Sequence, residues 1–179
     1  ALGRGDDVKV HDLTAGFGGD LVLLVAAGFE VRAVEKNPLV YCLLKDAVDR
    51  WIQRIDDPSQ LPSQFKIPNR VRDAVHAIQV FNEDSVNYLQ SLQAEDKGVL
   101  YLDPMFEEKR GARLSQGPMQ WMQKLVPHSQ DEAVSLVNAA LALPSRRVVV
   151  KRALKAEPFA GPLTHSFSGT SVRYDMYST

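Results

Sequence analysis

Short apolar runs alternate along the chain with longer segments whose apolar residues have helical spacing. The apolar runs predict strands over residues 8–13, 31–34, 77–81, 99–102 and 147–150. The helical spacings and capping residues predict helices over residues 20–27, 38–55, 84–92, 119–126 and 131–143. Near the C-terminus, segments 164–168 and 171–177 both alternate and predict a β-hairpin. This order is typical of a doubly wound α/β sheet, mostly parallel, with an antiparallel edge.

The strongest helix signal lies between residues 38 and 55. Asn37 and Pro38 supply an N-cap and a first-turn proline. The apolar residues that follow keep three- and four-residue spacing, which predicts one buried face: Val40, Leu44, Val48, Trp51, Ile52 and Ile55. We expect Cys42 to pack as a small apolar residue. Three prolines between residues 56 and 70 predict an irregular surface excursion, and a polar loop is expected over residues 111–117.

Length and composition narrow the class of protein. A chain of 179 residues, 45% hydrophobic and 24% charged, predicts one folded domain over residues 1–179. The net charge is −1, so any nucleic-acid binding has to use local basic patches. The chain begins at Ala1 rather than methionine, and we expect a further region upstream.

Several function classes find no support in the sequence. Cys42 is the single cysteine, which excludes an internal disulfide and a cysteine-cluster zinc site and fits a reducing cytoplasm. The four histidines are widely separated, so we expect no metal site. No serine stands in a G-x-S-x-G motif, and a hydrolase triad is not expected. No apolar run approaches the length of a membrane span.

A glycine turn follows the first predicted strand, in the stretch TAGFGGD. Gly16, Gly18 and Gly19 would let a ligand approach bare backbone and meet amide donors at the start of the next helix. Nucleotides are the usual ligands of such turns. The dinucleotide pattern G-x-G-x-x-G is incomplete, because Leu21 occupies its last position. The turn alone therefore leaves the identity of the cofactor open.

Acidic side chains follow the neighbouring strands at the same predicted edge of the sheet. Glu35 comes 17 residues after Gly18, close to the offset of about 20 at which an acid binds the ribose of NAD or S-adenosylmethionine (SAM). Asp20 would be unfavourable beside a pyrophosphate, whereas it could pair with the amino group of a sulfonium cofactor. One of Glu83 and Asp84 could accept a hydrogen bond from an adenine amine. Each of these acids could instead only cap or complement a helix start.

The stretch YLDPMF, at the end of the fourth predicted strand, carries the sharpest chemical signal. Pro104 stiffens the backbone beside Asp103, which helps to present a carboxylate and a main-chain carbonyl to an exocyclic amine. Phe106 could stack on the base that carries the amine. Basic side chains follow this strand and the last parallel strand, and they could hold RNA phosphates or be ordinary solvated charges: Lys109, Arg110, Arg113, Lys151, Arg152 and Lys155.

Together, the stretches DLTAGFGGD, VEKNP, YLDPMF, RRVVVKR and VRYDMY resemble the ribosomal RNA small-subunit methyltransferase J family. The resemblance implies a Rossmann-like class I methyltransferase fold and SAM as cofactor. It implies methylation of the N2 amine of a guanosine in small-subunit (16S) ribosomal RNA or in the assembled subunit. It assigns cofactor contacts to Gly19 and Asp20, to Glu35 and Lys36, and to the pair at positions 83 and 84, with Asp103 between cofactor and target.

Three other functions stay open at this stage. The amine-binding geometry also suits methylation of adenine N6 or of another exocyclic amine. A module that binds RNA without turnover would keep the same fold. An NAD-dependent oxidoreductase would use the same sheet and Glu35, although Leu21 and Asp20 disfavour it.

Overall fold

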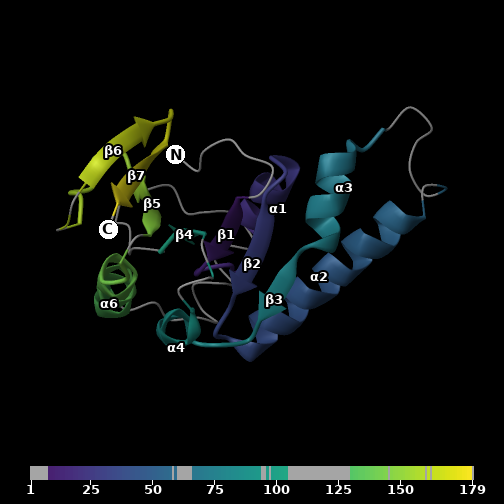
Figure 1. The fold of residues 1–179 in the computed structure, drawn as a ribbon, viewed down its shortest axis with the longest axis horizontal. Helices are drawn as coiled ribbons and strands as arrows, with labels where there is room; N and C mark the ends of the chain where they lie inside the picture. Colours follow the sequence, from purple (N-terminus) through teal and green to yellow (C-terminus); the bar gives the residue numbers. More distant parts are fainter. Residues whose placement is uncertain are drawn as a thin grey trace, which may run out of the picture.

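A computed structural model describes residues 8–57, 59, 66–93, 96, 98–104, 130–144, 146–159, 161 and 163–178. Seven strands form one sheet in the order β3-β2-β1-β4-β5-β7-β6 (Figure 1). The strands are β1 (Lys9–Asp12), β2 (Glu30–Val34), β3 (Gln79–Phe81), β4 (Val99–Leu102), β5 (Arg147–Ala153), β6 (Leu163–Ser168) and β7 (Val172–Ser178). The first five pair in parallel, and β7 pairs antiparallel with β5 and β6. The predicted mostly parallel sheet with a C-terminal antiparallel hairpin is confirmed.

Helices cover both faces of this sheet (Figure 1). They are α1 (Gly19–Ala26), α2 (Pro38–Asp56), α3 (Asn69–His76), α4 (Ser85–Ser91) and α6 (Gln130–Leu141). Apolar side chains of α1, α2 and α3 form one core with Val10, Val31 and Val149 of the sheet. Those of α4 and α6 form the other core with Leu100, Val148 and Val150. Because consecutive residues of β4 and β5 enter opposite cores, the centre of the sheet is buried on both faces.

The N-terminus and the buried face of α2 follow the predicted pattern. The Asn37 side chain accepts hydrogen bonds from the backbone N–H of Leu39 at 3.0 Å and of Val40 at 3.2 Å. The expected packing of Cys42 is wrong, because its side chain is exposed. At about 100° per residue, Cys42 lies roughly opposite Val40 on the helix, which turns it away from the sheet.

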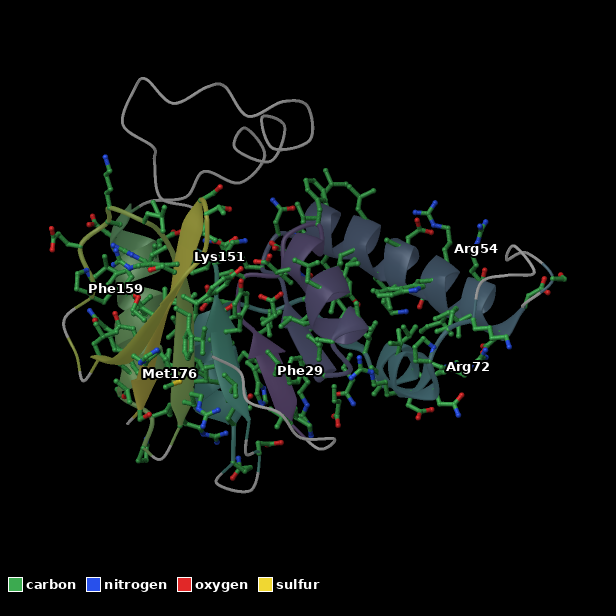
Figure 2. All side chains as sticks on the ribbon, turned by 90° about the horizontal axis from the view of Figure 1, so that it is seen from above. Phe29, Arg54, Arg72, Lys151, Phe159 and Met176 are labelled. Atoms are coloured by element: carbon green, nitrogen blue, oxygen red, sulfur yellow. The ribbon has the colours of Figure 1, made fainter. Side chains whose placement is uncertain are left out.

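Helix α3 is an element that the sequence analysis did not predict. It begins directly after Pro68 and buries Ala74 and Val75. Arg72 also ties it to the preceding helix, because its Nη1 donates to the Ile55 carbonyl at 3.0 Å (Figure 2). The irregular stretch expected over residues 56–70 therefore ends at Pro68, within the described part of that segment.

The carboxyl ends of β1 and β4 lie next to each other at the point where the strand order reverses. From β1 the chain proceeds to β2 on one side, whereas β4 pairs with β1 on the other. Open α/β sheets bind their ligands at this switch point. The glycine turn after β1, Glu35 after β2, the acids after β3 and the Asp103 corner after β4 are therefore brought to one edge of the sheet. The predicted helix over 119–126 and loop over 111–117 lie outside the described residues.

Candidate active site

Two glycines of the turn between β1 and α1 have a backbone conformation that residues with a side chain rarely adopt. Gly16 has a φ of 53° and Gly18 a φ of 81°, both in the left-handed region. A Cβ on Gly18 would also lie 2.7 Å from Cδ1 of Leu44. At Gly19, by contrast, a Cβ would meet none of the described residues within 4 Å. The turn thus brings bare backbone to the edge of the sheet, with open space beside the first helical residue.

Glu35, at the end of β2, lies against this turn. Its Oε2 accepts a hydrogen bond from the Gly16 N–H at 3.0 Å, and its Oε1 accepts one from the Asn37 N–H at 2.7 Å. The side chain is 8% exposed. Asn82, which sequence reasoning missed, donates from Nδ2 to the Glu35 carbonyl at 2.9 Å. Lys36 points to a different element, because it pairs with Glu132 of α6 at 2.7 Å.

The pair at positions 83 and 84 precedes α4. Asp84 is the N-cap of this helix, and its Oδ1 accepts hydrogen bonds from the N–H groups of Val86 at 2.9 Å and Asn87 at 3.4 Å. The capping alternative is therefore seen for Asp84, whose side chain is exposed, while Glu83 is half-buried. The next residue, Ser85, donates from Oγ to the Leu13 carbonyl at 2.6 Å and ties α4 to the end of β1.

Asp103 leaves β4 beside the end of β1. Its backbone N–H donates to Oγ1 of Thr14 at 2.7 Å, and Pro104 after it is buried. Thr14 also donates its own N–H to Oδ1 of Asp12 at 3.1 Å. These contacts fix the Asp103 corner on the β1 side. Thr14 was not singled out in the sequence, and Phe106 lies outside the described residues.

Lys151 of β5 joins the Asp103 corner to the helix of the glycine turn. Its Nζ lies 2.9 Å from both carboxylate oxygens of Asp20 and 2.9 Å from Oδ2 of Asp103. Tyr101 of β4 donates from its hydroxyl to Oδ2 of Asp20 at 2.7 Å. Figure 2 shows Lys151 between the C-terminal hairpin and α1. Side chains from α1, β4 and β5 therefore meet around one ammonium group.

The charges in this cluster are set by burial and by one another. Burial raises the pKa of Asp12 to about 7, and the nearby Asp20 and Asp103 carboxylates add to this effect. Burial also raises the pKa of Asp103, against the opposing pull of Lys151. Burial alone would lower the pKa of Lys151, but its hydrogen bonds to Asp103 and Asp20 raise it overall. Lys151 is therefore a permanent cation at neutral pH.

A family model described as "Putative SAM-dependent methyltransferase" matches residues 1–179. The chain belongs to this family. A relative from Pseudomonas aeruginosa is 38% identical over 170 residues, covering 94% of this chain and 59% of the relative. One from Pseudomonas fluorescens is 34% identical over 177 residues, covering 98% and 62%. Both are named "Ribosomal RNA small subunit methyltransferase J". The chain thus spans about 60% of the length of these curated relatives.

Solved structures of methyltransferases share the fold of this family member. A SAM-dependent methyltransferase from Neisseria gonorrhoeae is 28% identical, with a TM-score of 0.65 over 95% of this chain and 61% of that one. An rRNA methyltransferase from Streptomyces viridochromogenes has a TM-score of 0.57 at 15% identity, covering 99% of this chain and 78% of that one. The second likeness concerns the fold alone. Together they confirm the predicted Rossmann-like class I methyltransferase fold.

Arg152 and Lys155, two of the other basic candidates, are placed differently from Lys151. Arg152 stacks over the Phe159 ring, with Cζ 4.2 Å from the ring centroid, and donates to the Glu157 carbonyl. Lys155 is exposed in the turn after β5. Lys109, Arg110 and Arg113 lie outside the described residues.

Metal-ligand clusters and membrane-spanning helices are absent from the described part of the chain. None of its His, Cys, Asp and Glu side chains form a group of three or more that could hold a metal ion. None of its helices is long and apolar enough to cross a lipid bilayer.

Proposed function

We propose that this chain transfers a methyl group from SAM to the N2 amine of a guanosine in small-subunit ribosomal RNA. The observation that carries the proposal is the Lys151 ammonium, which contacts both Asp20, at the glycine turn, and Asp103, at the amine corner. The two halves of a methyl-transfer site thus meet at one point. The printed names of the curated relatives support ribosomal RNA as the substrate. A substrate of this kind would place the reaction in the cytoplasm.

The residues at the glycine turn fit SAM. Each Glu35 oxygen accepts one backbone N–H, and a carboxylate oxygen can accept a second hydrogen bond, here from a ribose hydroxyl. Asp20 and Asp103 bring two carboxylates to the single ammonium of Lys151, so the ionised cluster has an excess of negative charge. Such a cluster favours a cationic ligand over the pyrophosphate of NAD. We assign ribose binding to Glu35 and the amino-acid end of the cofactor to Asp20.

The further cofactor contacts are assigned to the backbone of the glycine turn, to Glu83 and to Lys36. Gly16, Gly18 and Gly19 would face the cofactor through their backbone. Glu83 is assigned to the adenine, because the Asp84 carboxylate already caps α4. Lys36 is assigned to the outer side of the ribose site, where its pairing with Glu132 would have to loosen.

The Asp103 corner suits an exocyclic amine. SAM supplies an electrophilic methyl group attached to a positively charged sulfur. Lys151 contacts Oδ2 of Asp103, which leaves Oδ1 able to accept an amine N–H and turn the nitrogen lone pair toward the methyl group. Pro104 has no N–H and adds no competing donor. We assign stacking on the guanine to Phe106.

Positioning does most of the work in this mechanism. Holding two reactants in a productive geometry can lower the activation barrier by roughly 7–11 kcal/mol. The proton of the amine leaves after transfer, to Asp103 or to water. A guanine inside an RNA helix cannot reach this corner, so the target has to be single-stranded or flipped out. Lys109, Arg110, Arg113 and Arg152 are proposed to hold phosphates of the RNA strand.

Tritiated methyl transfer to unmodified small-subunit RNA and to assembled subunits tests the proposal. Nucleoside analysis should recover the radioactivity as N2-methylguanosine, and Asp103→Asn should lose most of the transfer while its circular dichroism is unchanged. Label in N6-methyladenosine would refute the guanine assignment. Absence of label in both substrates, with RNA binding intact and unaffected by Asp103→Ala, would instead identify a module that binds RNA without turnover.

A further inference from the structure

Lys151 stands inside the site rather than on an RNA-facing surface. It lies in β5, opposite Tyr174 of β7, and shares its side of the sheet with Val149, which packs in the α1 core. The side chain is 21% exposed. An ammonium has three N–H donors, and the Lys151 Nζ already has three carboxylate oxygens at 2.9 Å. A phosphate would therefore have to displace one of these carboxylates.

We propose that Lys151 is a positioning residue, whose ammonium keeps the Asp103 carboxylate ionised and turned toward the amine while linking it to Asp20. This inference deepens the proposed methyl transfer and rests on it for its catalytic part. The bridge itself is a property of the free protein and can be measured without RNA. It replaces the phosphate contact expected for Lys151 from the sequence.

The charges around Asp103 show why a cation is needed there. Among the described residues, the titratable groups that interact with it are Asp12 from β1, Asp20 from α1, Tyr101 from β4 and Lys151 from β5. Burial and the Asp20 charge hold the pKa of Tyr101 above its usual range, so this hydroxyl stays protonated. Without Lys151, a half-buried Asp103 would face two other acids, and its pKa would rise further, so that its carboxyl would take up a proton at a higher pH. A protonated carboxyl can donate to the amine, but it no longer offers two accepting oxygens.

Loss of Lys151 should affect cofactor binding less than it affects methyl transfer. Asp20 would lose one cationic partner and become more available to the amino group of SAM, and the local charge would become more negative. We therefore expect SAM binding to be retained when methyl transfer falls. A residue that merely kept the site folded would weaken both together.

The first test measures Asp103 in the ligand-free protein by carbon-13 NMR of its carboxyl, assigned with Asp103→Asn. Lys151→Met should raise the pKa of Asp103 by at least about 1, the usual effect of removing an adjacent opposite charge. Lys45→Met is the matched control, because Lys45 pairs with Asp49 on the exposed side of α2. An unchanged Asp103 titration in folded Lys151→Met overturns the proposal. If that variant does not fold, Lys151→Gln gives the same comparison.

The second test separates rate from binding. Lys151→Met should lower kcat at least about tenfold at pH 7, move the acidic limb of the pH profile to higher pH, and leave the calorimetric Kd for SAM within about threefold. Lys151→Arg should restore part of kcat. A parallel loss of SAM affinity and kcat overturns the positioning role. Failure of the parent chain to methylate any RNA would refute the proposed function, while the Asp103 titration would still decide whether the bridge exists.

Discussion

Two neighbouring buried groups in β1 respond to pH in opposite directions. His11 is fully buried, and its Nδ1 lies 2.8 Å from the Tyr88 hydroxyl. Burial, with the positive charges of Arg32 and Arg146, lowers the pKa of His11 from 6.5 to about 4. Asp12 is 1% exposed, and burial raises its pKa from 3.8 to about 7. Both groups are therefore neutral in the folded protein near pH 6.

The sign and size of each effect follow from proton linkage. Between pH 6.5 and about 4 the unfolded chain protonates His11 and the folded chain does not, so stability falls with falling pH. Between about pH 7 and 3.8 the folded chain protonates Asp12 and the unfolded chain does not, so stability rises with falling pH. At about 1.4 kcal/mol per pH unit, the His11 effect reaches about 3 kcal/mol and the Asp12 effect about 4 kcal/mol. In the parent protein the two effects largely cancel.

Asp12→Asn removes the Asp12 effect, so that the pH dependence caused by His11 becomes measurable. The amide oxygen can still accept the Thr14 N–H, but the carboxyl titration is gone. We expect the free energy of unfolding of this variant to fall by about 2–3 kcal/mol from pH 7 to pH 4.5, while the parent changes much less. His11→Gln should show the reverse slope, with greater stability at pH 4.5 than at pH 7.

Urea unfolding followed by circular dichroism at pH 4.5, 5.5, 6.5 and 7.0 provides the measurement. The comparison is restricted to this range because Asp96 and Asp175 have lowered pKa values and lose their stabilising charge at more acidic pH. Parallel profiles for the parent and Asp12→Asn would refute the reasoning. They would mean that Asp12 titrates near its ordinary pKa in the folded chain.

Three further substitutions test other parts of the site and fold. Glu35→Gln should weaken SAM binding about 10- to 100-fold by calorimetry, because a charge-assisted hydrogen bond contributes about 1.5–3 kcal/mol; unchanged affinity would contradict the ribose assignment. Thr14→Val should slow methyl transfer about 2- to 10-fold, with Thr14→Ser close to the parent; equal loss in both would point to packing instead. Gly98→Ala should lower the free energy of unfolding by about 1–3 kcal/mol, since its Cβ would lie 2.7 Å from Nε2 of His11. Gly19→Ala, with open space at its Cβ, is the stability control.

The sequence predicted most elements because burial leaves a direct pattern. The run Val99–Leu102 is wholly apolar and is buried at every position, as expected for a central parallel strand. Helix α2 is predicted by its N-cap, Asn37, and by the apolar residues that repeat along one of its faces. Helix α3 has eight residues and follows a proline, and its stretch NRVRDAVH contains few apolar positions. Tertiary packing of Ala74 and Val75, rather than a periodic signal, accounts for that helix.

The sequence predicted which residues of the candidate site lie close together wherever the order of the strands alone determines this. The rule that parallel strands end at one edge brings Glu35 to Gly16 and Asp103 to Thr14 at the start of the glycine turn. Side-chain contacts across that edge depend on directions that no local pattern encodes. Asn82 and Ser85 donate hydrogen bonds to carbonyl groups from distant parts of the chain. The presence of a polar residue after a strand does not predict which distant carbonyl group it will bind.

Lys151 shows how a shift in one strand boundary changes a functional assignment. The apolar run ends at Val150, so the sequence predicted that Lys151 and Arg152 follow the last parallel strand, where they could hold RNA phosphates or be ordinary solvated charges. Pairing with β7 instead carries β5 on to Ala153, and in a strand consecutive side chains point to opposite faces. Lys151 therefore turns toward the acids on the α1 side, while Arg152 packs on Phe159. These two adjacent cations cannot follow the same RNA strand from one face. Of the two, we propose a phosphate contact for Arg152 alone.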